Sequence, residues 1–453
     1  MKKHSRLTAL LLALFLLLAS SACSGGETEE TTEATTEASQ TAPETTAAIT
    51  EETTEEEISV VAPPETAAPE TTEPKPAETI RIIMQNGKGE AILSALAEDK
   101  YKPVLEAREK ALLYSHSAEI ELSKADDLIK TIETLVLSGE SKYDLLLIDP
   151  FIGAELLNSG LLENLSGAGI ELTPESIGVG SSITKSLTVG GGVYLFASDA
   201  LVSDISATYA LKYNGTALSS DPVTKALAGE FTAELMFTYI AEAENALSVG
   251  SFSPVTLFRG AGGEIFTKDA KDMPTSAITS GTIFSTAYDA AIGLYSKTTD
   301  KAAIFTLEKL YPLAEGEIYL PLPKTYSTLE YSTPIDQYSL SLFAAPAGVV
   351  SGSRLSTLIT ALSSCSNDYR QAVRGEITEK GAKDAAQMLD IITENARLDL
   401  GILFGWGDIR DHIANGFNKS TSAADLLADR MTEMRNKAAE TAASILAGKL
   451  GIE

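Results

Sequence analysis

The chain has 453 residues, and its 63 acidic residues against 35 basic ones give a net charge of −28. An acidic protein of this kind is excluded as a nucleic-acid binder, since phosphate recognition needs a basic surface. Its two cysteines and three histidines lie far apart, which excludes a disulfide scaffold and a metal site built from those residues. With 44% hydrophobic residues, the chain is long enough for two or three folded domains.

Residues 1–22 have the features of a secretion signal. Three basic residues precede an apolar run from Ala9 to Ala19, which is too short to span a bilayer as a helix. Small residues and then Cys23 follow. This order resembles a bacterial lipoprotein signal, in which the cysteine becomes the lipidated first residue of the mature protein. Plain secretion after cleavage by the ordinary signal peptidase is the alternative.

Residues 23–79 predict a disordered stalk that begins at the lipidated cysteine. The part from 27 to 79 carries fifteen Glu and one Lys, so it holds about half of the net charge and leaves −17 for residues 80–453. Threonine, glutamate and proline bury too little apolar surface to offset the chain entropy of folding. We therefore expect a solvated spacer on the extracellular face of the cytoplasmic membrane, with a Gram-positive bacterium as the expected source.

Strands and helices alternate from Ile80 onward, which predicts an α/β fold. The apolar run Tyr143–Asp149 is typical of a strand buried on both faces of a parallel sheet. Ser123 is expected to cap a helix with an apolar stripe from Leu128 to Val136. The other expected elements are strands at 80–84, 193–196 and 338–345 and helices at 154–161 and 421–447.

Motifs for catalysis are weak in this sequence. There is no H-E-x-x-H, no G-x-S-x-G and no phosphate loop ending in G-K-[ST]. Gly190–Gly192 leads into an apolar stretch, so it predicts a turn and not a phosphate cradle. We expect a protein that is not an enzyme and that uses neither a metal nor a cofactor.

Polar and aromatic residues follow several predicted strands. Ligands of open α/β sheets bind outside the carboxyl ends of strands, which makes these residues candidates for a binding site. A turn or helix-capping role is the alternative for Asp149, and a place in the core is the alternative for Trp406. The candidates are Asp149, Phe151, Asp199, Phe258, Arg259 and Trp406.

Four segments resemble the extracellular solute-binding lipoproteins of ABC importers, in particular their carbohydrate-binding group. The first of them joins a strand to a helix that ends in Gly-Leu-Leu, and the second has the family's spacing of Tyr and Tyr-Asn. A Gly-Gly-x-x-Phe turn and the closing helices make up the rest. The segments are 143–162, 192–214, 262–266 and the helices after Trp406.

The resemblance implies two α/β lobes that are interleaved in the sequence and close on a ligand by a hinge. It also adds Gln337 to the expected ligand-binding residues. The expected first lobe is 80–200 with 336–382, and the second is 203–330 with 384–453. The expected crossings between the lobes lie near 198–206, 325–338 and 380–386.

The function that the resemblance implies is capture of a small solute and its delivery to an ABC permease by a monomer. A sugar or oligosaccharide is the first expectation, and aspartates in the cleft would also suit an amine or another cation. Two other classes stay open, namely a surface protein for adhesion or wall contact and a glycan hydrolase built on carboxylates.

Overall fold

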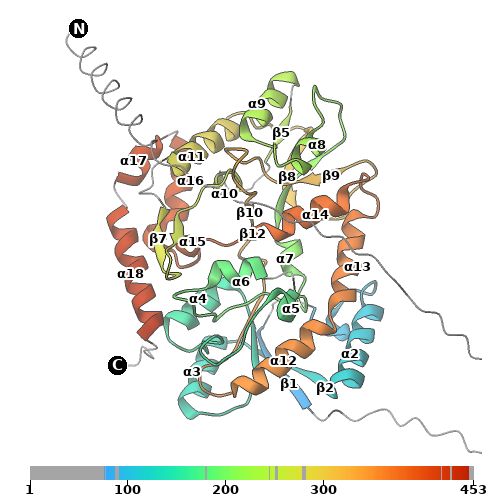
Figure 1. The fold of residues 1–453 in the computed structure, drawn as a ribbon, viewed down its shortest axis with the longest axis vertical. Coiled ribbons are helices and arrows are strands. Elements are labelled where there is room, and N and C mark those ends of the chain that lie inside the picture. Colours follow the sequence, from blue (N-terminus) through green and yellow to red (C-terminus); the bar gives the residue numbers. More distant parts are fainter. Residues whose placement is uncertain are drawn as a thin grey trace, which may run out of the picture. The chain divides into compact units, whose positions relative to one another are not determined.

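A computed structural model describes residues 76, 78–86, 91–178, 181–243, 245–249, 254–277, 282–419, 421–428 and 431–447 (Figure 1). These residues all belong to one compact unit, Thr71–Glu453. The predicted signal, the lipidation site Cys23 and nearly all of the predicted stalk lie outside the described residues. No helix within the described ranges is long and apolar enough to cross a membrane.

The first sheet has the strand order β11-β3-β1-β2. Its centre is β1 (Glu78–Gln85), which pairs in parallel with β2 (Ala118–Ala125) and β3 (Leu145–Ile148). The last strand, β11 (Leu342–Ala344), runs antiparallel to β3. All four residues of β3 are buried, which explains the continuous apolar run in the sequence.

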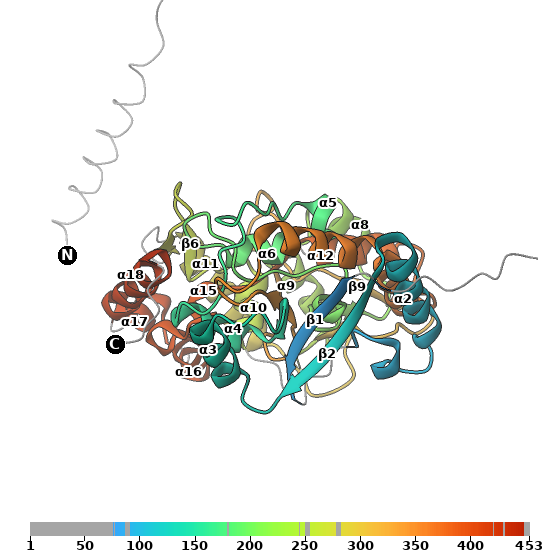
Figure 2. The same cartoon turned by 90° about the horizontal axis from the view of Figure 1, so that it is seen from below.

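Helices cover both faces of this sheet (Figures 1 and 2). Alternate residues of β1 point to opposite faces, so Ile82 packs into one apolar cluster and Ile83 into another. The cluster of Ile82 contains residues of α2 and α12, and that of Ile83 contains residues of α3 and α4. The helices of this region are α2 (Lys102–His116), α3 (Leu128–Ser138), α4 (Pro150–Asn158), α5 (Pro174–Ile177), α6 (Ser181–Leu187), α12 (Gly352–Ser364) and α13 (Asn367–Thr378), with the short helix η1 (Ser94–Leu96).

Three predictions about individual elements were wrong: the cap of α3, a strand at 193–196 and the start of β11. Ser123 lies within β2, because that strand pairs with β1 along its whole length, and Asp127 caps α3 in its place by accepting from the amide of Lys130. The stretch 193–196 forms a bridge to β11 only at Phe196. The strand expected from residue 338 begins at Leu342, and the residues before it form the cavity wall described below.

The second sheet has the order β5-β8-β4-β9. Phe305 on its strand β8 stacks on Tyr213 and Tyr239, with ring centroids 5.2 and 5.8 Å apart, and these rings form the centre of this core. Its strands are β4 (Tyr209–Tyr213), β5 (Leu247–Ser248), β8 (Phe305–Lys309) and β9 (Ile318–Leu320). The helices are α8 (Pro222–Leu227), α9 (Ala233–Glu242), α10 (Pro254–Gly260), α11 (Thr282–Tyr295), α14 (Ala385–Glu394), α15 (Leu400–Leu403), η4 (Trp406–Asp408), α16 (Ile409–Lys419), α17 (Ala423–Ala428) and α18 (Met431–Ala447), with the hairpin β6 (Phe266–Lys268)–β7 (Pro274–Ser276).

The chain passes between the two sheets more than once, which makes the lobes interleaved. It leaves the first sheet after β3, builds the second from β4 to β9, and returns to the first at β11. The crossing segments touch each other: Thr208 bridges Ile335, and β10 (Thr333–Pro334) pairs with β12 (Ala396–Arg397). The lobe boundaries given by residue number stay predictions.

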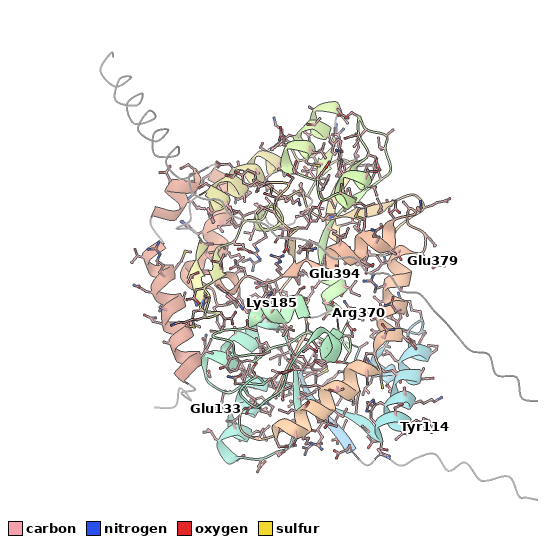
Figure 3. All side chains as sticks on the ribbon, viewed as in Figure 1. Tyr114, Glu133, Lys185, Arg370, Glu379 and Glu394 are labelled. Carbon is pink, nitrogen blue, oxygen red and sulfur yellow. The ribbon has the colours of Figure 1, made fainter. Side chains whose placement is uncertain are left out.

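A buried arginine on α13 holds the first of these crossings (Figure 3). Two Arg370 nitrogens donate to the carboxylate of Asp204 at 3.0 and 2.6 Å, and its Nε lies 3.4 Å from Asp199. Asp204 belongs to the short helix α7 (Ser203–Ser206), which leads directly into β4. The ion pair therefore ties α13 to the point where the chain enters the second lobe.

Asp144, just before β3, is a fully buried carboxylate held by two arginines. It accepts from Arg81 Nη2 at 2.8 Å and from Arg354 Nε at 2.9 Å, as well as from the amide of Arg81. Burial disfavours the charged carboxylate, but these hydrogen bonds outweigh burial and lower the pKa of Asp144 to about 2.

Because that pKa lies below the unfolded value of about 3.9, Asp144 stabilises the fold above pH 4 and loses its effect as the pH falls toward 2. We expect the difference in unfolding free energy between wild type and Asp144→Asn to shrink by about 2 kcal/mol between pH 7 and pH 2.5. Urea unfolding at a series of pH values measures it, and a constant difference would contradict the assigned role.

Candidate ligand-binding site

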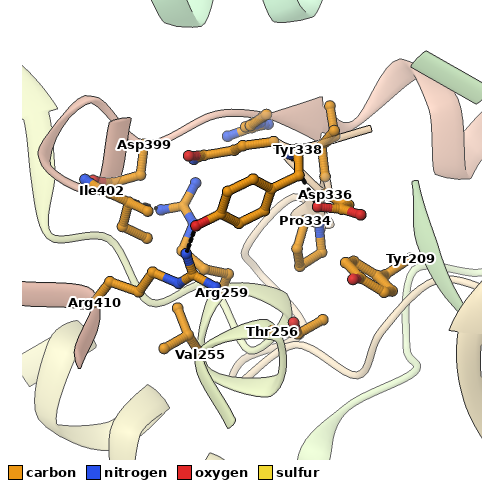
Figure 4. Close-up of a pocket in the computed structure, with 13 residues that line it drawn as sticks. Tyr209, Val255, Thr256, Arg259, Pro334, Asp336, Tyr338, Asp399, Ile402 and Arg410 are labelled. Atoms are coloured by element: carbon orange, nitrogen blue, oxygen red, sulfur yellow. Dashed lines mark hydrogen bonds and ion pairs between the residues drawn. The ribbon is translucent and has the colours of Figure 1, made fainter. Parts of the chain in front are cut away.

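A cavity of about 340 Å³ lies where the crossing segments meet the helices of the second lobe (Figure 4). Residues from α10, β12, α15 and α16 form its wall together with the segment that follows β10. Its lining residues are Tyr209, Val255, Thr256, Arg259, Pro334, Ile335, Asp336, Gln337, Tyr338, Arg397, Asp399, Ile402 and Arg410. A cavity at the crossings can respond directly to the relative position of the lobes.

Tyr338 presents the principal aromatic surface of this cavity. Its side chain is 64% exposed, and its ring packs on Phe151 of α4 at a centroid distance of 4.8 Å. Arg410 donates to the Tyr338 hydroxyl at 2.8 Å, and its guanidinium carbon lies 5.3 Å from the ring centroid. An exposed ring held from two sides offers a rigid apolar surface on which a ligand can pack.

The two carboxylates of the cavity are each engaged by a basic residue. Asp399 accepts from Arg259 Nη1 at 3.1 Å, and it also caps α15 by accepting from the amide of Ile402 at 3.2 Å. Asp336 pairs with Lys309. Burial works against the charge of Asp336, but the hydrogen bonds from Lys309 and Ser339 lower its pKa.

Other polar groups of the wall are constrained by burial. Burial and the nearby charge of Asp336 raise the pKa of Tyr209 to about 12, so its hydroxyl stays protonated and can donate to a ligand. Gln337 is buried, and its Oε1 has no hydrogen-bond partner within the described part of the protein. Such an atom is costly to leave unpaired, and a ligand hydroxyl is one group that could satisfy it.

A second cavity, of about 560 Å³, shares Arg259 and Arg397 with the first. On one side it is lined by Ser182, Lys185 and Ser186 of α6, and on the other by residues of β6 and the end of α14. Lys185 and Glu394, both labelled in Figure 3, belong to these two sides. Elements from both lobes therefore border the combined cleft.

Three of the candidates from the sequence lie at this site. Arg259 and Gln337 line the cavity, and Phe151 supports the ring of Tyr338. Asp149 caps a helix, which is the role expected from the sequence as the alternative to ligand binding. It accepts hydrogen bonds from the amides of Phe151 and Ile152 at 2.9 Å. Its carboxylate is used by the start of α4, so we leave it out of the proposed site.

The structure places Asp199, Phe258 and Trp406 away from the cavity wall. Asp199 faces the buried Arg370. Phe258 is completely buried and packs on Phe284 at 4.9 Å. Trp406 is 3% exposed, and its Nε1 donates to Thr441 Oγ1 at 3.0 Å, so it occupies the core that was its alternative. None of these three is retained in the proposed site.

Several lining residues had no signal in the sequence. Tyr338 fell inside a segment expected to be a strand, and Asp399 resembles any other aspartate that caps a helix. Arg397 belongs to the two-residue strand β12 and Arg410 to the first turn of α16, and no sequence pattern distinguished either of them. Within the described ranges, no group of three or more His, Cys, Asp or Glu side chains is arranged to hold a metal ion.

Comparisons with known proteins give matches only among solved structures. No family model and no curated protein matches the chain. A structure titled cyclo/maltodextrin-binding protein complexed with maltotetraose is 12% identical, covers 79% of this chain and 97% of its own, and has a TM-score of 0.50. That likeness concerns the fold, and it confirms the expected two-lobed α/β architecture.

Two further structures align over similar lengths with lower scores. A family 1 extracellular solute-binding protein from Alicyclobacillus acidocaldarius is 13% identical, with 83% of this chain and 99% of that chain covered and a TM-score of 0.47. An ABC transporter solute-binding protein from Agrobacterium vitis S4 with bound D-mannitol is 12% identical, with 80% and 98% covered and a TM-score of 0.40.

Proposed function

We propose that this chain, which has the fold of the two-lobed solute-binding proteins, binds a small polyhydroxylated solute between its lobes and carries out no chemistry on it. The observation that carries the proposal is the exposed ring of Tyr338 in a cavity at the lobe crossings. An aromatic face packs on the apolar face of a sugar ring, while nearby donors and acceptors bind its hydroxyls. The maltodextrin-binding structure with maltotetraose agrees with a solute of this kind.

Ligand binding can be coupled to the position of the lobes through contacts that already join them. Phe151 on α4 of the first lobe supports Tyr338 on a crossing segment. Ser182 Oγ of α6 donates to the carbonyl of Glu394 at 2.6 Å, and Ser186 Oγ accepts from the amide of Leu398 at 3.3 Å. A solute that touches both sides would favour the closed arrangement by its differential affinity for it.

The finer parts of the function are also proposals. The lipoprotein-like signal and the predicted stalk support an anchor at Cys23 and a position outside the cell, from which a solute would pass to a separate ABC permease. Replacement Cys23→Ser should release the protein into the medium. Retention on the membrane to the same extent as wild type would contradict the anchor.

A glycan hydrolase is less well supported by the cavity. Such enzymes use two carboxyl groups, of which one is held protonated as the general acid. Asp336 and Asp399 are each paired with a basic side chain, and the pKa of Asp336 is lowered. Asp336 therefore lacks the surroundings of a general acid, and Asp399 is already engaged by Arg259.

A thermal-shift screen of the full chain tests the binding function. The panel should contain neutral sugars, sugar alcohols, acidic sugars, amines and short peptides, all at one ionic strength. A ligand that binds only the native state raises stability by RT ln(1 + [L]/Kd), so at least one class should raise the melting temperature. No shift with any class would contradict a soluble-ligand carrier and favour adhesion or wall contact.

A further inference from the structure

Arginines are concentrated at the cavity, although residues 80–453 carry a net charge of −17. Arg259, Arg397 and Arg410 all line the smaller cavity. In the adjoining one, Lys185 and Lys268 lie among three glutamates, Glu264, Glu330 and Glu394, so the excess of positive charge belongs to the smaller cavity. The two aspartates of the smaller cavity are paired with Arg259 and with Lys309, which lies outside its lining. The charge that remains available to a ligand there is therefore positive.

Of the three arginines that line the smaller cavity, Arg410 has the fewest contacts with carboxylates of the described residues. It donates to the neutral hydroxyl of Tyr338 and lies beside that ring, and no ion pair among the described residues includes it. Its guanidinium has five donors in a planar fork, so the bond to Tyr338 leaves several of them available. This cation lies in the wall of a cavity that closure of the lobes would separate from water.

The other two arginines also keep donors for a ligand. Arg259 uses Nη1 for both of its bonds, to Asp399 and to the carbonyl of Gly263. Arg397 pairs through Nη2 with Glu330, whose side chain is 81% exposed. Exposed pairs of that kind contribute little and are readily exchanged for a better partner.

Taken with the proposed function, on which this inference rests, these contacts indicate the chemical class of the solute. We infer that the solute is an acidic sugar or a similar polyhydroxylated anion, with its carboxylate or phosphate group on Arg410 and the neighbouring arginines. Closing the cavity over a neutral solute would leave the Arg410 charge desolvated without a counter-charge, which is costly. An anion supplies that charge and can accept two parallel hydrogen bonds from one guanidinium.

A cationic ligand does not fit this arrangement. The expectation of an amine rested on aspartates in the cleft, chiefly Asp149 and Asp199. The first caps α4 and the second faces Arg370, so neither carboxylate lies in the cavity wall. The arginines that do line it would repel an ammonium group.

Matched pairs of neutral and anionic sugars test the inference on the full chain. The probes are D-glucose against D-glucuronate and glucose 6-phosphate, D-galactose against D-galacturonate, and maltotetraose and D-mannitol as larger neutral solutes. Thermal shift at constant ionic strength finds binders, and calorimetry gives their affinities. We expect an anionic probe to bind at least about 10-fold more tightly than its neutral partner. Comparison of the uronates with glucose 6-phosphate shows whether the site prefers a carboxylate or a phosphate group.

Variants of Arg410 connect the charge to this position. Arg410→Gln should lower the affinity for the anionic probe about 10-fold or more. Arg410→Lys keeps the charge but not the planar fork, so it should lower the affinity by less. Arg435→Gln, at an exposed position on α18, is the matched control and should change affinity less than about twofold. The melting temperatures of the unliganded variants show whether each one is folded.

The outcomes separate this inference from the proposed function. If a neutral sugar binds as tightly as its anionic partner and Arg410→Gln has no effect, the anionic class is wrong and the carrier function stands. If neither neutral nor anionic probes bind, both are contradicted.

Discussion

Replacement of Arg370 by Met is expected to lower the free energy of unfolding by about 3–5 kcal/mol. Arg370 is almost completely buried, and its guanidinium is the cationic partner of Asp204 and Asp199. Methionine fills much of the same space but leaves these carboxylates without a counter-charge in the protein interior. Urea unfolding followed by the fluorescence of Trp406, the single tryptophan of the chain, measures the change.

Arg374→Met is the matched control for this prediction. Arg374 lies one turn further along α13 and pairs with Asp390, whose side chain is 53% exposed, so its loss should cost less than about 1 kcal/mol. Adding Asp204→Asn to Arg370→Met should restore part of the stability, because it removes one of the unpaired charges. Equal effects of Arg370→Met and Arg374→Met would contradict the structural role of the buried pair.

Tyr338→Ala is expected to weaken the binding of the solute about 10- to 100-fold while leaving the fold intact. Tyr338 is 64% exposed, so removal of its ring should change the unfolding free energy by no more than about 1 kcal/mol. Tyr338→Phe keeps the ring and loses only the hydroxyl bond with Arg410, which predicts a smaller loss of affinity. Calorimetry with the strongest ligand of the panel measures each variant.

Tyr114→Ala provides the control for that measurement. Tyr114 is 60% exposed and lies on α2 of the first lobe. It lines neither of the two cavities, and Figure 3 shows it apart from Lys185 and Glu394, which line the second one. Its loss should leave the affinity unchanged. A similar loss of affinity in both variants would show that Tyr338 does not contact the solute.

The fold was predictable where burial leaves a pattern along the chain. The run from Leu145 to Ile148 is apolar because both faces of the sheet are covered, and its sequence predicted a parallel strand. The helix cap predicted at Ser123 was wrong. Serine is a good helix cap in isolation, but pairing with β1 extends strand β2 through this residue. Local preference was overruled there by a contact with residues about 40 positions away.

The site was less predictable, because its residues come from separate segments that only the fold brings together. Arg259 and Arg410 lie 151 positions apart and meet at one cavity. For Trp406, the local context allowed either a ligand contact or a place in the core, and the structure shows the core. Gly405 adopts φ 64°, a conformation that favours glycine, and the indole beside it packs between Phe404 and Phe266. The glycine serves the turn that directs the ring into the core.

The claim that one small solute binds at the lobe crossings is tested most directly by titration calorimetry of the full chain. The titrant is the compound that gives the largest thermal shift, and wild type is compared with Tyr338→Ala and Tyr114→Ala. We predict one binding site per chain, with affinity reduced about 10- to 100-fold in Tyr338→Ala and unchanged in Tyr114→Ala. Binding of equal affinity in wild type and Tyr338→Ala, or no binding of any compound, would contradict the claim.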